Sequence, residues 1–465
     1  MTDTQYDAIV IGAGQAGVPL SQALAGAGMR TALVEREHVG GTCINEGCTP
    51  TKTMVASGRV AYLARRGVDY GVRTGPLSVE LAKVRERKRA IVDSFRNGSQ
   101  GRIEKTKNLE LIFAEAEFAG AQTLRVRKAN GAEATLGAEK IFINAGCRPA
   151  VPKLEGLSAV PFLNSTSIME LDQVPEHLIV LGGGYIGLEF AQMFRRFGSE
   201  VTILEMGPRL IAREDEDVSA AIREIVENEG VEVRLDAKCI GFAKQGDEIV
   251  ADVDCLSGAP QVHGSHVLLA VGRRPNTDDL GLDAAGVAVD ARGYVVVDDE
   301  LRTNVPNIWA LGDCNGRGAF THTANNDAEI VVANLLENGA RRVSDRITAY
   351  GLYVDPPLGR VGMTDAEIRK SGVKALVGKR PMTRVGRAVE KGETQGFMKI
   401  AVDAETGAIL GAAILGPGGD EVIHSILDVM YAKAPWTVIR GAMHIHPTVS
   451  ELVPTMLGEL KPMDG

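Results

Sequence analysis

The fold is decided by DAIVIGAGQAG, residues 7–17, in which an apolar run leads directly into three closely spaced glycines. An apolar helix pattern follows as far as Gly28, and TALVE, residues 31–35, then has the pattern of a second buried strand. A strand, a glycine turn, a helix and a second strand in this order are typical of a dinucleotide-binding unit.

Each residue of this pattern has a physical reason. Gly12 permits the tight turn, Gly14 lets a pyrophosphate approach the backbone, and Gly17 allows the helix to pack closely on the strand. The N-terminus of the helix then presents its dipole and free N–H groups to the phosphates. Glu35 ends the second strand, where a carboxylate accepts hydrogen bonds from a ribose diol.

The same pattern recurs 170 residues later, as LIVLGGGYIG at 178–187 and VTILE at 201–205. The matching glycines are Gly182, Gly184 and Gly187. Glu205 follows its first glycine by 23 positions, the same spacing that separates Glu35 from Gly12. A single glycine fingerprint is a weak signal, because a structural glycine loop has the same appearance. Two complete copies predict two dinucleotide sites.

A second repeated segment follows each copy. INAGCRP at 143–149 and LAVGRRP at 269–275 are both apolar strands that run into a glycine turn ending in proline. These segments are predicted to be the points where the chain leaves one nucleotide-binding domain for another. We expect Gly146 to line the first dinucleotide site and Gly272 to line the second.

The rest of the chain completes the predicted architecture. TNVPNIWALGD, residues 303–313, is predicted to be a buried strand ending in an acidic residue beside a dinucleotide. After about residue 345, strand-like segments such as GRVGM at 359–363 alternate with helix patterns, without a glycine fingerprint. The sequence therefore predicts an α/β protein with two Rossmann-like dinucleotide-binding domains and a C-terminal α+β domain.

Bulk composition excludes several classes of protein. The 465 residues suggest about three domains, and 45% hydrophobic with 24% charged residues is typical of a soluble globular chain. No run of eighteen apolar residues is present. The net charge of -9 and the lack of a basic cluster disfavour nucleic acid as a partner. Because the first strand pattern begins at Tyr6, no signal peptide is expected, and a cytoplasmic location is predicted.

The segment GGTCINEGCTPTK, residues 40–52, contains the one closely spaced pair among six cysteines, Cys43 and Cys48. One helical turn brings such a pair within disulfide reach, whereas zinc sites seldom use this spacing and no second Cys/His pair follows. No metal site is predicted. Two buried, inert cysteines are the plain alternative. Gly41 and Thr42 allow close approach of a bulky cofactor, and a helix beginning at the pair favours thiolate.

GGTCINEGCTPTK resembles the active-site signature of the pyridine nucleotide-disulfide oxidoreductases, which include glutathione reductase, dihydrolipoamide dehydrogenase and mercuric reductase. The resemblance covers essentially the whole chain, since both fingerprints, the Gly-Asp segment at 312–313 and HIHPTVSE at 444–451 stand in the family's order. It implies an FAD domain of residues 1–150 and 273–345, an NAD(P) domain of 151–272, and a dimerisation domain of 346–465.

The resemblance also implies roles for individual residues. Cys48 is expected to lie against the flavin, and Cys43 to be the interchange thiol that meets the substrate. Lys52 is expected beside the flavin ring, paired with Glu189. Two further residues are implied, Tyr185 as a gate of the nicotinamide pocket and Asp313 as a ligand of the FAD ribityl chain. Hydride from the nicotinamide would reduce FAD, and FAD would open the Cys43–Cys48 disulfide.

A thiol relay needs a group that accepts and returns a proton near neutral pH, and histidine is the natural choice. His446 is followed five residues later by Glu451, a carboxylate that can orient the imidazole. In relatives this His-Glu pair comes from the partner subunit, so the resemblance implies a homodimer with a shared active site. His444 is a further candidate beside the His446–Glu451 pair, and the alternative is an ordinary surface histidine.

Glu205 favours NADH over NADPH, because a carboxylate at this position binds an unphosphorylated ribose and repels a 2′-phosphate. Arg209 and Arg213 follow soon afterwards and would soften this preference if they folded back over the ribose. Their plain interpretation is a solvated surface charge.

Several segments, among them YVDPPLGRVGM at 353–363, are most similar to the mercuric-reductase-like branch, which includes reactive-chlorine-resistance flavoproteins. Mercuric reductases carry a further cysteine pair near the C-terminus, whereas this chain has no cysteine after Cys314. This difference argues against mercury as the substrate. The acceptors left open are a metal ion such as Cu(II) or Hg(II), hypothiocyanous acid and a small disulfide. A dihydrolipoamide dehydrogenase is the alternative enzyme, and a non-catalytic flavin-binding protein the alternative from another class.

Overall fold

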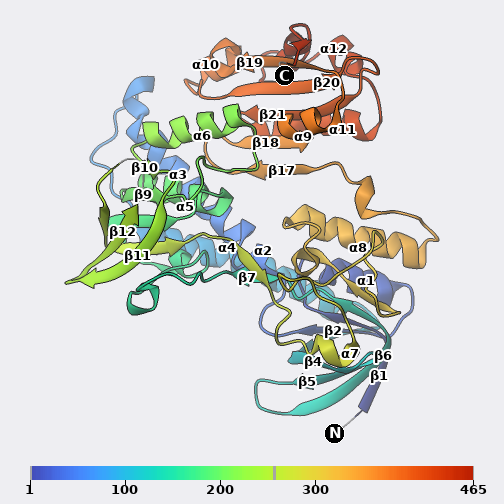
Figure 1. Cartoon of the computed structure of the whole chain (residues 1–465). Helices are drawn as coiled ribbons and strands as arrows, with labels where there is room; N and C mark the ends of the chain where they lie inside the picture. The colour runs from blue at the N-terminus through green and yellow to red at the C-terminus, as the bar shows by residue number, and fades with distance from the viewer. Residues whose placement is uncertain (1–2, 255–257, 464–465) are drawn as a thin grey trace. The chain divides into compact units, whose positions relative to one another are not determined.

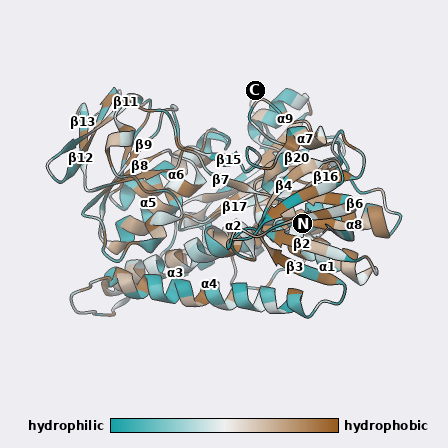
Figure 2. Cartoon of the chain, turned by 90° about the horizontal axis from the view of Figure 1, so that it is seen from below, coloured by the Kyte–Doolittle hydropathy of each residue, from teal (hydrophilic) through white to brown (hydrophobic). Residues whose placement is uncertain are grey.

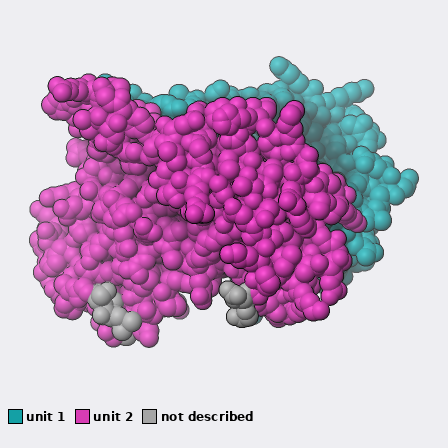
Figure 3. All heavy atoms as spheres, turned by 90° about the horizontal axis from the view of Figure 1, so that it is seen from above, with its two compact units in different colours: residues 1–54, 82–150, 272–346 teal, residues 55–81, 151–271, 347–465 magenta. Residues whose placement is uncertain are grey.

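The computed structural model describes residues 3–254 and 258–463. By its internal contacts the chain divides into two compact units, which Figure 3 colours separately. Unit 1 comprises residues 1–54, 82–150 and 272–346, and unit 2 comprises residues 55–81, 151–271 and 347–465. Two of the boundaries between the units fall within the long helices α3 (Cys48–Arg65) and α4 (Leu81–Glu104).

Unit 1 is built on one mixed sheet with the strand order β3-β2-β1-β6-β5-β4, and β16 pairs with β6. Its strands are β1 (Asp3–Ile11), β2 (Thr31–Glu35), β3 (Leu109–Phe113), β4 (Glu115–Gly120), β5 (Thr123–Arg127), β6 (Glu133–Ile143) and β16 (Ile308–Ala310). The pairs among β1, β2, β3, β6 and β16 are parallel, whereas β4, β5 and β6 pair antiparallel. Around the sheet lie α1 (Gly17–Gly26), α2 (Gly41–Asn45), α7 (Leu282–Ala285) and α8 (Thr321–Leu336).

The central strand β1 is buried on both faces, which explains its continuous apolar sequence. Ile9 and Ile11 contribute to one hydrophobic cluster, whereas Ala8 and Val10 contribute to a second cluster that includes Leu20 of α1. Successive side chains of a strand point to opposite faces, so a strand between two layers needs apolar residues throughout. The helix α4 differs from β1 in this respect, since many of its residues are hydrophilic (Figure 2).

Unit 2 contains the second nucleotide-binding pattern. A parallel sheet has the order β10-β9-β8-β14, and β11, β12 and β13 form an antiparallel sheet. The elements of this part are β8 (His177–Leu181), α5 (Tyr185–Phe197), β9 (Glu200–Leu204), α6 (Glu216–Asn228), β10 (Glu232–Arg234), β11 (Lys238–Gln245), β12 (Glu248–Asp254), β13 (Gln261–Gly264) and β14 (His266–Leu269) (Figure 1).

The C-terminal part of unit 2 is an antiparallel sheet of order β17-β18-β21-β20-β19-β22 with helices. Its strands are β17 (Ala349–Leu352), β18 (Leu358–Gly362), β19 (Ala375–Pro381), β20 (Phe397–Asp403), β21 (Ile409–Leu415) and β22 (Lys461–Pro462). Its helices are α9 (Asp365–Ser371), α10 (Gly386–Glu390), α11 (Gly419–Tyr431), α12 (Thr437–Gly441) and α13 (Val453–Leu457). A short two-stranded ribbon elsewhere, in unit 1, joins β7 (Cys147–Pro149) to β15 (Arg273–Pro275), the two repeated turns that the sequence singles out.

The predicted α/β class and both strand-turn-helix-strand units are confirmed. The strand predicted over 303–313 is wrong in length, because β16 covers only Ile308–Ala310. Asn307 and Gly312 both have positive φ angles, 63° and 70°, so the backbone leaves the extended conformation on each side. No helix in the described part of the chain is long and apolar enough to cross a membrane.

Candidate active site and nucleotide sites

The first glycine turn, in unit 1, leaves no room for side chains. Gly12 has a φ of 100°, and a Cβ there would lie 2.3 Å from the carbonyl oxygen of Asn144. A Cβ on Gly17 would lie 2.0 Å from the carbonyl oxygen of Gly12. Only glycine avoids both conflicts, so the turn and the start of α1 depend on these two positions.

Glu35 is held rigidly beside this turn. Its Oε2 accepts a hydrogen bond from the N–H of Ala13 at 2.8 Å, and its Oε1 accepts one from the N–H of Glu37 at 2.9 Å. The N–H of His38 also donates to Oε1, at 3.3 Å. A carboxylate has about four acceptor positions, so these three bonds orient it and leave capacity for a ligand hydroxyl.

Asn144, which the sequence analysis did not identify, supports the same turn. Its Nδ2 donates to the carbonyl oxygen of Gly12 at 3.1 Å, and a Cβ on Gly14 would lie 3.0 Å from that nitrogen. The sequence contains one indication of this role. In the repeated segments INAG (143–146) and LAVG (269–272), Asn144 of the first corresponds to Ala270 of the second.

The second turn, in unit 2, repeats the geometry. Gly182 has a φ of 107°, and a Cβ there would lie 2.5 Å from the carbonyl oxygen of Ala270. A Cβ on Gly187 would lie 2.0 Å from the carbonyl oxygen of Gly182. Around Gly184, by contrast, a Cβ would meet no described atom within 4 Å. The second turn is therefore more open than the first at its middle glycine.

Glu205 matches Glu35 in its contacts. Its Oε2 accepts from the N–H of Gly183 at 2.6 Å, and its Oε1 accepts from the N–H of Gly207 at 2.7 Å. Arg209, in contrast, donates to the carbonyl oxygen of Ala212 and lies 3.3 Å from the carboxylate of Glu216.

The remaining residues predicted to bind FAD lie in unit 1 and fit that cofactor. A Cβ on Gly41 would lie 2.8 Å from the Cα of Gly14, so two backbone segments without side chains meet at this point. Burial raises the pKa of Asp313, whereas the charge of Arg273 opposes the rise. A largely buried carboxyl that can accept a hydrogen bond suits a ribityl hydroxyl.

The other predicted residues near the two sites occupy turns. Thr42 lies on α2, and its Oγ1 is 3.4 Å from a guanidinium nitrogen of Arg273. Gly146 follows β6 and Gly272 follows β14, each with a positive φ, 68° and 110°. Arg273 also donates to the carbonyl oxygen of Cys147, and so joins the two repeated turns.

The cysteine pair lies on two helices rather than on one helical turn. Cys43 belongs to α2, whereas Cys48 is the first residue of α3. The chain turns between them at Gly47, where a Cβ would lie 2.9 Å from the carbonyl oxygen of Thr42. The two side chains nevertheless meet, as free thiols joined by a hydrogen bond.

The contact with Cys48 has the largest effect on the pKa of Cys43. The hydrogen bond with Cys48, followed by burial, raises the pKa of Cys43 far above its ordinary value, and Thr321 and the charge of Lys52 counteract only part of this rise. Thr321, at the start of α8, also lies 3.4 Å from the sulfur of Cys48 through its Oγ1. The sequence offered no signal for Thr321, because only the fold brings α8 to the pair.

Tyr185, at the start of α5, is part of a buried polar cluster. Its hydroxyl donates to Oε1 of Glu214 at 3.3 Å, and the hydroxyl of Tyr350 donates to the same oxygen at 2.7 Å. The two tyrosine rings pack edge to face, with centroids 5.7 Å apart. Burial raises the pKa of Glu214, and its Oε2 has no hydrogen-bond partner among the described residues.

Lys52 belongs to unit 1 and Glu189 belongs to unit 2. Glu189 is buried on α5, where its Oε1 accepts a hydrogen bond from the N–H of Tyr353 at 3.1 Å. Lys52 lies on α3, one turn after Cys48. Their predicted pairing stays a prediction.

His446 and Glu451 form the predicted pair. The imidazole Nδ1 lies 2.9 Å from Oε2 of Glu451 and 3.1 Å from Oε1. The side chain of His446 is 80% exposed, whereas that of Glu451 is 16% exposed. His444 makes a different contact, from its Nδ1 to the carbonyl oxygen of Ala442. The geometry leaves Nε2 of His446 directed away from its carboxylate partner and open to another group.

One acidic cluster resembles a metal site by position alone. Asp215, Asp217 and Asp365 bring carboxylate oxygens within 4.8 Å of one another. The ammonium group of Lys399 contacts all three at 2.7–2.9 Å, and Arg360 pairs with Asp215. Lys379 also pairs with Asp217, so three internal cations offset the three carboxylates of the cluster, which joins the start of α6 to the C-terminal sheet.

Comparisons with known proteins agree with this geometry. A family model described as pyridine nucleotide-disulphide oxidoreductase matches residues 6–328, and a model of the family's dimerisation domain matches residues 348–457. The chain is 37% identical to the probable pyridine nucleotide-disulfide oxidoreductase RclA of Escherichia coli over 96% of this chain and 97% of that protein. The Cu(II) complex of that HOCl-induced flavoprotein disulfide reductase superposes with a TM-score of 0.89 at 36% identity, covering 98% of this chain and 99% of the other.

More distant relatives have other named activities. A mercuric reductase of Streptomyces lividans is 32% identical, and a dihydrolipoyl dehydrogenase of Geobacillus stearothermophilus is 31% identical. Each alignment covers 96% of this chain and 94% of the relative. The chain belongs to the pyridine nucleotide-disulphide oxidoreductase family and is an FAD-dependent enzyme of that family that uses a pyridine nucleotide.

Proposed function

We propose that this enzyme passes electrons from NADH through the Cys43–Cys48 pair to a thiol-reactive acceptor, with Cu(II) as the leading candidate. The observation that carries the proposal is the contact between the two thiols at the start of α3, beside Lys52 and Thr321. Two thiols in contact can close to a disulfide and release two electrons. A pair of inert core cysteines would be buried, whereas Cys48 is exposed.

We further propose the division into an FAD domain of residues 1–150 and 273–345, an NAD(P) domain of 151–272 and a dimerisation domain of 346–465. FAD, held by the Gly12 turn, Glu35, Gly41 and Asp313, supplies two-electron transfer between the nicotinamide and the cysteine pair when it is bound. The polar contacts of Glu35 and the glycine turn support this assignment.

The dithiol reaction balances without a further reagent. Cys43 and Cys48 lose two protons and two electrons and form one S–S bond, while two Cu(II) ions each gain one electron and become Cu(I). Soft thiolate ligands favour Cu(I), so the product is stabilised where it forms. The raised pKa of Cys43 means that its proton must be removed before the thiolate binds a metal or attacks a disulfide.

His446 is the proposed proton acceptor. The Nδ1–H of His446 donates to the carboxylate of Glu451, which places the free lone pair of the neutral imidazole on Nε2. The pair would serve the Cys43–Cys48 pair of the second subunit in a homodimer. The exposed side chains of Met443 and Ile445, fully and 79% exposed, flank His446 and support a partner surface there.

NADH is the proposed donor. Both oxygens of Glu205 are held by backbone N–H groups, so the carboxylate stays beside the Gly182 turn, where it disfavours a 2′-phosphate. Arg209 is engaged by Glu216 instead, which supports the preference. A cytoplasmic location remains part of the proposal.

Cu(II) is favoured over Hg(II) on two grounds. A Cu(II) complex has been solved for the similar RclA of Escherichia coli, and this chain has no cysteine after Cys314 to deliver mercury. Hypothiocyanous acid and small disulfides would react with the same dithiol.

The proposal is tested with the FAD-loaded enzyme under anaerobic conditions. NADH and NADPH are compared as reductants, and Cu(II), Hg(II), hypothiocyanous acid and a small disulfide are compared as acceptors. We expect faster reduction by NADH and rapid turnover of Cu(II), lost in Cys43→Ser and in Cys48→Ser. Equal turnover in both variants and the wild type would show that the acceptor does not react at the pair.

Dihydrolipoamide dehydrogenase activity is the second candidate, favoured by the 31% identity to the Geobacillus stearothermophilus enzyme and by the NAD-type Glu205. It predicts rapid NAD reduction by dihydrolipoamide. Turnover of dihydrolipoamide far above that of every oxidant tested would replace the first proposal with this one.

A further inference from the structure

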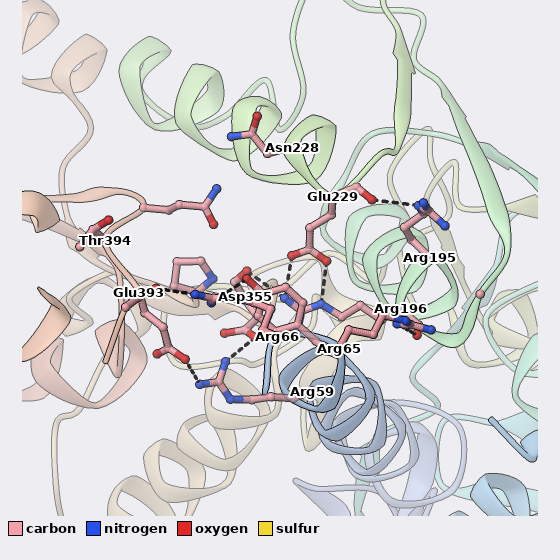
Figure 4. Close-up of a pocket in the computed structure, with 15 residues that line it drawn as sticks. Arg59, Arg65, Arg66, Arg195, Arg196, Asn228, Glu229, Asp355, Glu393 and Thr394 are labelled. Atoms are coloured by element: carbon pink, nitrogen blue, oxygen red, sulfur yellow. Dashed lines mark hydrogen bonds and ion pairs between the residues drawn. The ribbon is translucent and has the colours of Figure 1, made fainter. Parts of the chain in front are cut away.

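A pocket of about 690 Å³ lies within unit 2, apart from the residues assigned to the redox reaction. It is lined by the C-terminal ends of α3 and α5, by the end of α6, and by the segments 355–356 and 392–395 (Figure 4). Pockets of 300–1,000 Å³ are the usual size for small-molecule ligands. The volume exceeds that of a single hydrated ion.

Arginine dominates the lining. The five arginines are Arg59, Arg65, Arg66, Arg195 and Arg196, and the three carboxylates are Glu229, Asp355 and Glu393. The formal charge of the lining is therefore positive by two, in a chain whose net charge is -9. The C-terminal ends of α3, α5 and α6 supply about half a negative charge each, which leaves an excess of about half a positive charge.

The carboxylates are shared by only two of the arginines. Figure 4 shows the contacts running from Glu393 through Arg59 and Asp355 to Arg196 and Glu229. Arg196 also stacks on Tyr62, with its guanidinium carbon 3.9 Å from the ring centroid. This chain of ion pairs uses both oxygens of Glu229 and fixes one wall of the pocket.

Arg65 and Arg195 stand outside this network. Arg65 donates to the carbonyl oxygen of Arg196, and Arg195 donates to the carbonyl oxygens of Glu229 and Ser199. Neither forms an ion pair with a carboxylate among the described residues. Burial, and then the positive charges of Arg195 and Arg196, lower the pKa of Arg65. The charge of Glu229, whose oxygens are bound by Arg196, opposes this lowering only in part, so like charges are held together at the wall.

We propose that this pocket binds a small molecule carrying a phosphate group, with Arg65 and Arg195 as its main ligands. Guanidinium groups recognise phosphate through paired N–H donors, and a dianion offsets the repulsion between the two arginines. The amide of Asn228 and the hydroxyl of Thr394 also line the pocket and offer neutral hydrogen bonds to the rest of such a ligand. The site does not depend on the proposed redox function.

The test uses the FAD-loaded enzyme with NAD at saturation, so that both dinucleotide sites are filled. Isothermal titration with inorganic phosphate, pyrophosphate and glycerol 3-phosphate separates free phosphate from an organic phosphate ester as the ligand. We expect saturable binding of at least one of these probes. We expect binding to weaken at least about tenfold in the double variant Arg65→Gln, Arg195→Gln, because the substitutions remove the charge-assisted hydrogen bonds to the phosphate.

Arg223→Gln is the matched control, since Arg223 is exposed on α6 in an ion pair with Glu227 and does not line the pocket. The single variant Arg65→Gln tests the site if the double variant does not fold. Arg65 donates to a backbone carbonyl, which an amide side chain can also do, so this substitution disturbs the fold less. Absence of saturable binding for all three probes, or equal affinity in wild type and Arg65→Gln, would overturn the proposal.

Discussion

The two glycine turns have the same backbone plan but different surroundings. In both, the first glycine has a positive φ and the third glycine lies against the carbonyl oxygen of the first. In both, a glutamate accepts backbone N–H bonds, three at Glu35 and two at Glu205. In the first turn the side chain of Asn144 packs against Gly14 and donates to the carbonyl oxygen of Gly12. The second turn has Ala270 at the corresponding position, and no described atom lies within 4 Å of a Cβ on Gly184. Tyr185 follows the open turn, within a polar cluster of its own.

The first turn suits a cofactor that stays bound, and the second suits a substrate nucleotide that binds and dissociates in each cycle. A turn closed by Asn144 and Gly41 holds a permanent ligand in one geometry, as FAD requires. An open turn suits a nicotinamide that must enter and leave in each catalytic cycle, with Tyr185 as its proposed gate. The comparison can be tested by four sets of variants.

The largest difference is expected between Gly12→Ala and Gly184→Ala. At Gly12 a Cβ would lie 2.3 Å from a carbonyl oxygen in a left-handed conformation, so we expect loss of FAD and of folded protein. At Gly184 the added methyl would meet no described atom within 4 Å but would enter the space predicted for the pyrophosphate of the nicotinamide nucleotide, so we expect retained FAD and an NADH KM about tenfold higher. FAD content and steady-state kinetics measure both; equal FAD loss in the two variants would contradict the comparison.

Asn144→Ala is expected to have the next largest effect. It removes the hydrogen bond to the partly buried carbonyl oxygen of Gly12, and an acceptor that loses its partner in a buried place costs about 1–3 kcal/mol. We expect faster FAD release and a lower melting temperature, with an unchanged NADH KM. Asn130→Ala, in an exposed turn, serves as the control. Unchanged FAD release would show that Asn144 does not distinguish the two turns.

Glu205→Gln is expected to change the choice of nucleotide. The amide still accepts one backbone hydrogen bond but no longer repels a 2′-phosphate, so the ratio of kcat/KM for NADH to that for NADPH should fall by up to about tenfold, or about 1.4 kcal/mol. Glu35→Gln, in the first turn, should leave this ratio unchanged. A constant ratio in Glu205→Gln would remove the structural basis for NADH preference.

The smallest effect is expected from Glu214→Gln beside the gate. Because burial raises the pKa of Glu214 above 4.5, its contribution to stability is complete below pH 4.5 and is lost as the pH rises through the folded-state pKa. The melting temperature of the variant should therefore increase relative to wild type as the pH rises, by about 1–2 °C for each kcal/mol. A difference that does not vary with pH would show that Glu214 does not titrate.

The sequence predicted repeated local patterns well. The strand over TALVE is β2, and the helix after the second fingerprint ends at Phe197, just before the predicted Gly198. These elements are specified locally, by glycine turns and apolar periodicity. The strand over 303–313 and the single helical turn of the cysteine pair were wrong, because backbone angles at Asn307 and Gly312 and the turn at Gly47 override the local pattern.

Other residues of the sites had no usable signal. Thr321 lies in a helix remote in sequence from Cys48, and Glu214 and Tyr350 reach Tyr185 from separate elements. A sequence shows spacing within a segment, but a contact between distant segments depends on packing.

The sequence by itself determined the two dinucleotide turns, the cysteine pair and the His446–Glu451 pair, because each depends on residues within one short segment. The tertiary structure decided how those segments are supported. It placed Asn144 behind the first turn, left the second open, and brought Thr321 to the thiols. Long-range packing sets which groups are buried, which hydrogen bonds form and which charges lie side by side, so it alone specifies the environment in which local motifs act.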